Sequence, residues 1–179
     1  DEIISFSISD DMSTSGNVMH MAAAELEAED RFHVINSANL STGIGLLVIE
    51  AAIMAKEGKT SEEIITKIEE LKPLVRASFV VDTLTYLYRG GRCSGLAALA
   101  GGALKLHPQI IVVDGVMKPA KKYRGNMLHV TLDYVKDMEE DLKKAKKDRV
   151  FITHSGCPEP VIAEVKQYLE ALDIFQDIR

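Results

Sequence analysis

The sequence contains little cysteine, no long apolar run and no excess of basic residues, and each shortage argues against a class of protein. The two cysteines, Cys93 and Cys157, lie far apart and form no Cys-x-x-Cys pair. Neither a disulfide framework nor a zinc site is therefore indicated, and a cytoplasmic location is expected. No apolar stretch approaches the ~20 residues of a membrane span, and no export signal is visible. The net charge of −6 argues against a general nucleic-acid binder.

What the sequence does contain is typical of a folded protein. Hydrophobic residues make up 46% and charged residues 27% of its 179 residues, which is enough for one domain or more. The chain opens at Asp1 without a methionine, and residues 3–8 already resemble a buried strand. We therefore expect a segment of a longer protein, in which a missing neighbouring strand would leave a sheet edge exposed.

Strands alternate with helices in the first part of the chain. Residues 3–8 and 32–35 are short apolar runs typical of strands, and each precedes apolar residues at helical spacing. Thr60 and Glu63 form a capping box that begins a third helix, and Gly58 is a suitable stop for the helix before it. This order favours a parallel α/β layer. The helical positions are Val18, Met21, Ala22 and Leu26, then Ile44, Leu47, Val48 and Ala51, then Ile64, Ile65, Ile68 and Leu71.

The pattern changes after Pro73. Residues 110–113 and 116–117 flank Asp114-Gly115, a strong signal for a two-residue hairpin because both turn positions need positive φ. Antiparallel pairing is therefore expected in this part of the chain.

A domain boundary is expected at this change of pattern. Residues 1–73 are assigned to the remainder of a first α/β domain whose amino-terminal part is absent. Residues 74–179 are assigned to a second α+β domain, with a mixed or antiparallel sheet, whose carboxy-terminal end is absent. The other elements predicted in the second domain are strands over 78–81 and 150–153 and helices over 96–104, 128–146 and 161–172.

Most templates for catalysis fail. Gly58-Lys59-Thr60 resembles the end of a phosphate-binding loop, but Ile53 stands where the first glycine is needed. Gly43-x-Gly45 lacks the third glycine of a dinucleotide site, and the five histidines show no metal-ligand spacing. Neither a cofactor nor a metal is expected. One enzymatic alternative stays open, a hydrolase-like reaction that uses His154 and Cys157 and requires a thiol of low pKa.

Polar loops follow both strands of the predicted parallel layer. Ser13 and Ser15 lie between the first strand and the first helix, where free N–H groups and the helix dipole favour an anion. Ser37 holds the corresponding position after the second strand. A serine in the first loop alternatively serves only as a helix cap. Two such loops side by side predict a site for a carboxylate or a phosphate.

The run Arg89-Gly90-Gly91-Arg92 follows the strand predicted over 78–81. Two glycines between two arginines form a turn that directs both guanidinium groups toward one acidic or phosphorylated partner. Alone, such a run is typical of a solvated loop. Its position between an apolar strand and the helix predicted over 96–104 favours a fixed presentation.

Together these residues resemble the DegV family of bacterial fatty-acid-binding proteins over nearly the whole chain. The order and spacing of several motifs carry the resemblance. They are residues 34–37, 41–46, Glu57-Gly58-Lys59 with Glu62-Glu63-Ile64, residues 79–84, Tyr86-Leu87, residues 89–92, Pro108, Asp114-Gly115 and Arg124-Gly125.

The resemblance implies a two-domain α/β fold that buries a long-chain fatty acid between its domains and catalyses nothing itself. A separate ATP-dependent fatty acid kinase would receive the acid and make an acyl phosphate for phospholipid synthesis, a role that allows transient contact with a membrane surface. Ser13 matches the serine that holds the carboxylate, with Ser15 and Ser37 as neighbouring candidates. Arg89 and Arg92 match the pair that faces the kinase.

The chain departs from the family pattern at identifiable positions. Residues 13–16 are Ser-Thr-Ser-Gly where the family usually has Ser-Gly-Thr-Tyr, and Asn36 replaces the usual aspartate. An amino-terminal Thr-Ser and a carboxy-terminal histidine that also meet the ligand in the family have no counterpart. A third interpretation, beside the carrier and the hydrolase, is an interaction scaffold without lipid that docks through Arg89 and Arg92.

Overall fold

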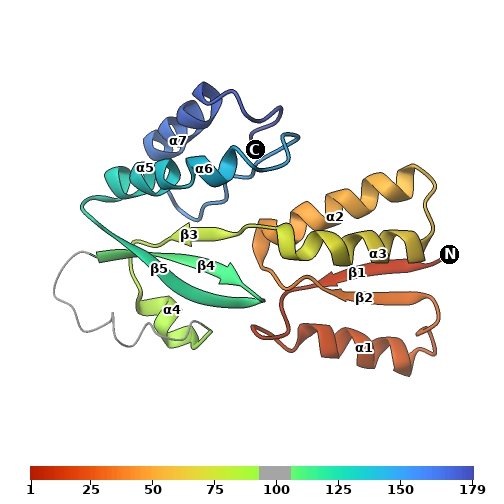
Figure 1. Ribbon diagram of the computed structural model, residues 1–179. Helices are drawn as coiled ribbons and strands as arrows, with labels where there is room; N and C mark the ends of the chain where they lie inside the picture. Colours follow the sequence, from red (N-terminus) through yellow and green to blue (C-terminus); the bar gives the residue numbers. More distant parts are fainter. Residues whose placement is uncertain (93–105) are drawn as a thin grey trace.

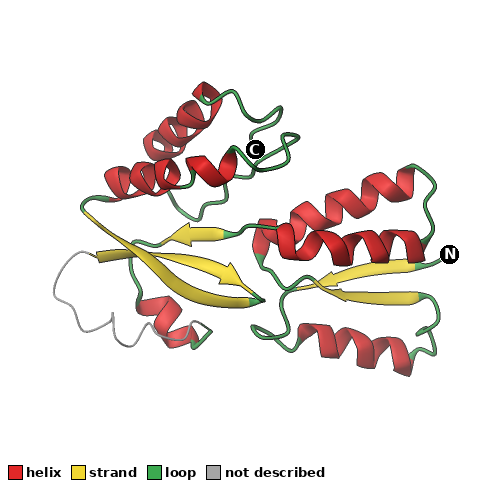
Figure 2. Cartoon of the chain, in the orientation of Figure 1, coloured by secondary structure: helices red, strands yellow, loops and turns green. Residues whose placement is uncertain are grey.

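The computed structural model describes residues 1–92 and 106–179, which fold around two separate sheets (Figure 1). In the first, β1 (Ile3–Ser7) and β2 (Phe32–Asn36) pair in parallel, with Ser7 opposite Asn36. Helix α1 (Ser15–Glu25) covers one face of this sheet, and α2 (Ser41–Lys56) and α3 (Ser61–Leu71) cover the other (Figure 2). We call these five elements, with the loops that join them, the parallel part.

The core of the parallel part lies between its sheet and the helices α2 and α3. It consists of Ile35, Leu47, Ala51, Ile64 and Ile68. Burying an aliphatic side chain of this size stabilises the fold by about 1.5–3 kcal/mol.

Local signals define the boundary between α2 and α3. Gly58, with φ +82°, follows the end of α2, a conformation that glycine adopts without strain. The predicted capping box is confirmed, because the Thr60 hydroxyl accepts from the Glu63 N–H and the Glu63 carboxylate accepts from the Thr60 N–H at 2.9 Å.

The predicted first helix forms, but the face that predicts it points outward. Val18, Met21 and Leu26 are 59%, 71% and 75% exposed, whereas the buried residues of α1 are Gly16 and Ala23. A Cβ atom at position 16 would lie 2.6 Å from Asp10 Oδ1 and 3.0 Å from Ser7 Oγ. The helix therefore approaches the sheet through small residues, and its larger apolar side chains stay on the surface.

The second sheet is antiparallel, in the order β3–β4–β5. Its strands are β3 (Ser78–Val80), β4 (Leu106–Val113) and β5 (Val116–Arg124). The predicted hairpin is confirmed, with Asp114 and Gly115 at φ +52° and +76°. The α/β class, with a parallel sheet followed by an antiparallel one, is therefore as predicted.

Helices on this sheet complete what we call the antiparallel part. The short helix η1 (Lys72–Leu74) contacts α3 and leads from it to β3, and the short helix α4 (Thr85–Gly90) follows β3. A core of Tyr123, Val130, Tyr134, Val135, Val165 and Leu169 joins β5 to α5 (Met127–Asp137) and α7 (Glu159–Ala171).

The helix predicted over 128–146 is wrong in its length. It ends at Asp137, and a single turn, α6 (Glu139–Leu142), follows after Met138. Met138 and Leu142 both pack on the core of this part, and three acidic residues at the start of α6 suit the positive end of a helix dipole. A charged run does not reveal such a break.

The strand predicted over 150–153 is also wrong. Val150 makes only an isolated bridge with Ile178. The Ile152 N–H donates to the Arg179 carbonyl, and the Arg179 N–H donates to the Val150 carbonyl. Val150 and Ile152 pack on the helices of the antiparallel part, so their apolar character reflects a helical neighbour instead of a sheet. The helix predicted over 161–172 is confirmed as α7, and the one predicted over 96–104 lies outside the described residues.

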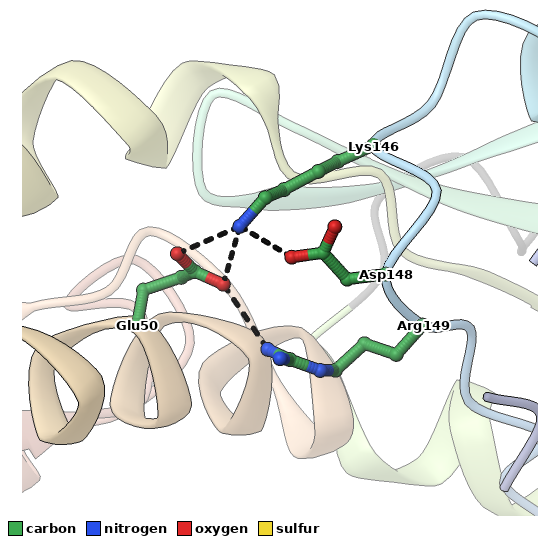
Figure 3. Close-up of polar contacts among 4 residues, drawn as sticks. All are labelled: Glu50, Lys146, Asp148 and Arg149. Carbon is green, nitrogen blue, oxygen red and sulfur yellow. Dashed lines mark hydrogen bonds and ion pairs between the residues drawn. The ribbon is translucent and has the colours of Figure 1, made fainter. Parts of the chain in front are cut away.

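The two parts meet along several contacts. An apolar cluster crosses between them, with buried Met12 from the parallel part against Ile110 and Met117 of the second sheet. The Ser9 hydroxyl donates to the Gly115 carbonyl at 2.6 Å. Glu50 on α2 pairs with Lys146 and Arg149 of the antiparallel part (Figure 3).

Candidate functional site

The loop between β1 and α1 contains the first group of predicted site residues. Ser9 is fully buried, its N–H donates to the Asn39 carbonyl, and its carbonyl accepts from Met12 and Ser13. Ser13 Oγ in turn accepts from the Ser15 N–H at 3.2 Å. The hydrogen bond to Asn39, which follows β2, therefore fixes the position of this loop, and Ser13 lies just before the start of α1.

Ser15 is the first residue of α1, and its hydroxyl is unusual. The Ser15 Oγ atom is buried, and within the described parts of the chain it has no hydrogen-bond partner. The first amides of an α-helix also lack intrahelical partners, and the helix dipole favours an anion there. A buried hydroxyl without a partner costs free energy, so this helix start has hydrogen-bonding capacity that a ligand oxygen would use.

Ser37 differs from the other two serines. Its side chain is fully buried, Oγ donates to the Asn39 carbonyl at 3.2 Å, and it accepts from the Asn39 N–H. Both roles of this hydroxyl are already filled by the backbone of its own loop. The structure thus gives Ser37 a structural role in shaping the loop that supports Ser9.

The arginine pair lies at the end of α4, a helix that the sequence did not predict between β3 and the glycines. Gly90 is the last residue of α4, and Gly91 follows with φ +66°. The predicted turn is thus a helix end with one left-handed residue. Arg89 and Arg92 are both exposed.

Arg92 reaches the loop that contains Ser13. Its Nε lies 3.5 Å from the Met12 carbonyl oxygen, and its Nη1 donates to the Gly90 carbonyl at 2.6 Å. Two motifs that lie about eighty positions apart in sequence are therefore neighbours in space. The sequence predicts different partners for the two motifs and contains no signal for this contact.

A hollow of about 410 Å³ lies at this junction, within the usual size range of small-molecule pockets. One acidic and one basic side chain line it, together with glycine backbone and two apolar residues. The lining residues are Asp11, Met12, Gly90, Gly91, Arg92 and Val116.

The apolar wall of the hollow continues into the core. Met12 lines the hollow and is also a buried member of the cluster that joins the two parts. Partly buried apolar residues from both parts pack against this cluster. They are Ile8 and Leu40 from the parallel part and Phe79, Leu84, Leu87 and Val112 from the antiparallel part. Polar groups at the surface and apolar side chains beneath them are the features that an amphipathic ligand requires.

The hydrolase interpretation finds little support in the geometry. Burial raises the pKa of the Cys157 thiol, the opposite of what a thiolate nucleophile needs. Between His154 and Cys157 the structure contains no hydrogen bond.

Within residues 1–92 and 106–179, no three His, Cys, Asp or Glu side chains gather as metal ligands. In the same residues, no helix has the length and apolar character of a membrane span.

Two contributors to the site are missing from the sequence predictions. Ser9 connects the loop to the hairpin at Gly115, where an added Cβ would lie 2.6 Å from the Ser9 hydroxyl. The alternation of Ser5, Ser7 and Ser9 with apolar residues was the available signal for Ser9, because it places all three on one face of the strand. No pattern marked Gly115 beyond its turn.

Comparisons with known proteins agree with the motif resemblance. A family model described as "Uncharacterised protein, DegV family" matches residues 1–177. A DegV domain-containing protein of Clostridium perfringens is 33% identical over 171 residues, which are 94% of this chain and 59% of the relative. The chain thus spans little more than half of that relative.

Solved structures extend the likeness to the fold. A structure described as fatty acid binding of a DegV family protein from Thermus thermophilus has a TM-score of 0.83 and 27% identity, and it covers 99% of this chain and 62% of its own. A stearic acid-binding protein from Eubacterium ventriosum has a TM-score of 0.79 and 25% identity, with 97% and 61% covered.

Proposed function

Because the chain belongs to the DegV family, we propose that it binds a long-chain fatty acid between its two parts and presents it to a separate ATP-dependent fatty acid kinase. The chain itself performs no catalysis in this proposal. The kinase makes an acyl phosphate that enters phospholipid synthesis in the cytoplasm, with transient contact at a membrane surface. The division into domains at residues 73 and 74 is part of the same proposal.

The single observation that carries lipid binding is the buried Ser15 hydroxyl beside Ser13 at the start of α1, which has no hydrogen-bond partner among residues 1–92 and 106–179. A carboxylate there would accept from both hydroxyls and from the first helix amides, and hydrogen bonds to a charged group are stronger than neutral ones. Ser13 remains the primary carboxylate ligand and Ser15 the second. Ser37 supports the loop, and its only proton is already donated to the Asn39 carbonyl.

The acyl tail is assigned to the apolar cluster that joins the two parts. Met12 connects the hollow to this cluster, which contains buried Ile110 and Met117. Fatty acids in the Thermus and Eubacterium relatives support the ligand class.

The kinase is assigned to Arg89 and Arg92, with unequal roles. Arg89 is exposed on α4 and contributes only to docking, since a guanidinium fork suits carboxylates and phosphates on a partner. Arg92 lines the hollow and lies at the carbonyl of Met12, the residue before Ser13, so it is also assigned to the carboxylate end of the lipid. This position beside Met12 makes Arg92 the link between the loaded ligand and the docked kinase.

Mass spectrometry of the lipid released from the purified chain tests the first half of the proposal. A fatty acid of 14 to 18 carbons is expected, and its repeated absence after incubation with such acids would contradict lipid binding. The matched control for Ser13→Ala and Ser15→Ala is Ser155→Ala, because Ser155 is exposed and far from α1 in sequence.

Acyl phosphate formation with a fatty acid kinase and ATP tests the second half. Arg89→Ala should lower the rate about tenfold or more with lipid content unchanged, the effect of losing a hot-spot arginine from an interface. Arg92→Ala should lower both the rate and the lipid content, and exposed Arg31→Ala should lower neither. An unchanged rate in the double Arg89→Ala, Arg92→Ala variant would reject the docking assignment.

A further inference from the structure

We propose that residues 146–153, the tie segment, hold the parallel and antiparallel parts together, and that Glu50 is the residue that positions this segment. The lipid consequence rests on the proposed function, which assigns the ligand to the space between the parts. The tie itself rests only on contacts within the chain.

The first contact is a network of four charged residues, Glu50 on α2 and three residues of the tie segment (Figure 3). Both Glu50 carboxylate oxygens accept from Lys146 Nζ, at 3.1 and 3.0 Å, and Oε1 also accepts from Arg149 Nη1 at 3.1 Å. Asp148 pairs with Lys146 at 2.6 Å. Hydrogen bonding to Asp148, followed by that to Glu50, raises the pKa of Lys146, so Lys146 stays charged near neutral pH.

The second contact lies near the start of α2. The hydroxyls of Thr42 and Thr153 share a hydrogen bond at 2.7 Å. Thr42 and Glu50 are eight residues apart, which is about 12 Å along a helix. The tie segment therefore follows α2 for more than two turns and is fastened near both ends.

The other side of the tie segment is anchored in the antiparallel part. Val150 and Ile152 pack against the core that contains α5 and α7. Backbone hydrogen bonds join Val150 to Asp177 and Ile152 to Arg179. One short segment thus inserts apolar side chains into one part and directs polar side chains onto a helix of the other.

Partial burial gives the Glu50–Arg149 pair more weight than an ordinary surface ion pair, although the side chains of Lys146 and Asp148 are more exposed. The side chains of Glu50 and Arg149 are only 24% and 18% exposed, whereas fully exposed pairs contribute little to stability. Removing the Glu50 charge leaves Lys146 and Arg149 facing one another with only Asp148 to offset them. The resulting repulsion destabilises the arrangement in which α2 lies against the tie segment.

The consequence is an equilibrium between closed and open arrangements of the two parts. A ligand held between them leaves through the open arrangement, so its dissociation rate follows the open population. Weakening the network raises that population without touching Ser13, Ser15 or the hollow.

Stopped-flow dissociation of a bound fluorescent fatty acid tests the inference in the 179-residue chain. Glu50→Gln keeps the shape of the side chain and removes its charge, and it should raise the dissociation rate about fivefold, the effect of a loss near 1 kcal/mol. Glu70→Gln makes the same chemical change at an exposed ion pair within a single helix, to Lys67 at 2.9 Å in α3, and should leave the rate unchanged. Glu50→Arg should raise the rate further, and adding Arg149→Glu should restore it. Equal rates in the Glu50→Gln and Glu70→Gln variants would overturn the proposal.

A distance measurement separates the tie from the lipid. Spin labels at Thr66 on α3 and Gln167 on α7, both exposed, report the separation of the two parts in lipid-free protein lacking its native cysteines. Glu50→Gln or high salt should broaden this distribution, whereas Glu70→Gln should not. If wild type retains no fatty acid, the proposed function fails and the distance distribution alone decides on the tie. An unchanged distribution in Glu50→Gln rejects it.

Discussion

Replacing Ser15 by alanine should preserve or raise the stability of the lipid-free chain and lower its affinity for a fatty acid. The Ser15 hydroxyl is buried without a partner in the described parts of the chain, and such a group costs about 1–3 kcal/mol of desolvation. Alanine removes that cost together with a few packing contacts. The lipid-free Ser15→Ala variant should therefore be as stable as wild type or more stable, by up to about 1 kcal/mol.

Affinity should fall in the same variant. A hydrogen bond to a charged group contributes about 1.5–3 kcal/mol, which corresponds to about a 10- to 150-fold increase in Kd for a fatty acid. Ser13→Ala is the informative comparison, because Ser13 Oγ also accepts from the Ser15 N–H. Losing this cap-like bond should destabilise the lipid-free chain by about 0.5–2 kcal/mol, in addition to weakening binding.

Urea unfolding of lipid-free protein and displacement of a fluorescent fatty acid measure the two effects. Ser155→Ala should change neither quantity. Two results would refute the reasoning: destabilisation of the lipid-free chain by Ser15→Ala, which would mean that the hydroxyl has a partner in the protein, and unchanged affinity, which would mean that the ligand oxygen lies elsewhere.

Three further predictions concern the fold that supports the site. Ile68 is fully buried in the parallel part, so Ile68→Ala should lower the free energy of unfolding by about 2–5 kcal/mol in urea; a loss below that range would mean that the neighbouring helices close the cavity. Gly115→Ala should destabilise the chain by about 1–3 kcal/mol, because φ is +76° and the new Cβ would meet the Ser9 hydroxyl at 2.6 Å; Gly45→Ala, within α2 and with open space around its Cβ position, is the control. Burial and then the hydrogen bond to Asp137 raise the pKa of Tyr123, so the folded state keeps this proton longer than the unfolded state. The resulting stability is complete below about pH 10 and declines as the pH rises above it; Tyr123→Phe should flatten that decline in pH-dependent unfolding, and an unchanged slope would contradict the assignment.

Local signals in the sequence predicted the elements whose stabilising interactions are themselves local. Thr60 and Glu63 are three residues apart, and the hairpin at Asp114 and Gly115 depends on the φ values of those two residues. Both are confirmed for that reason. The strand predicted over 150–153 failed because an apolar run indicates burial but not the element that buries it.

The sequence by itself determined the chemistry available to this protein: a family-specific order of motifs, hydroxyls at a helix start and a pair of arginines. Only the tertiary structure decided which of these groups meet. It brought Arg92 to the Met12 carbonyl and engaged Ser37 within its own loop. It also left Ser15 Oγ without a partner among the residues that the structure describes and fastened Glu50 to a segment about one hundred residues away. The contacts of Arg92 and Glu50 depend on how the two sheets pack against each other, and contacts between residues so distant leave no periodic pattern in a single sequence.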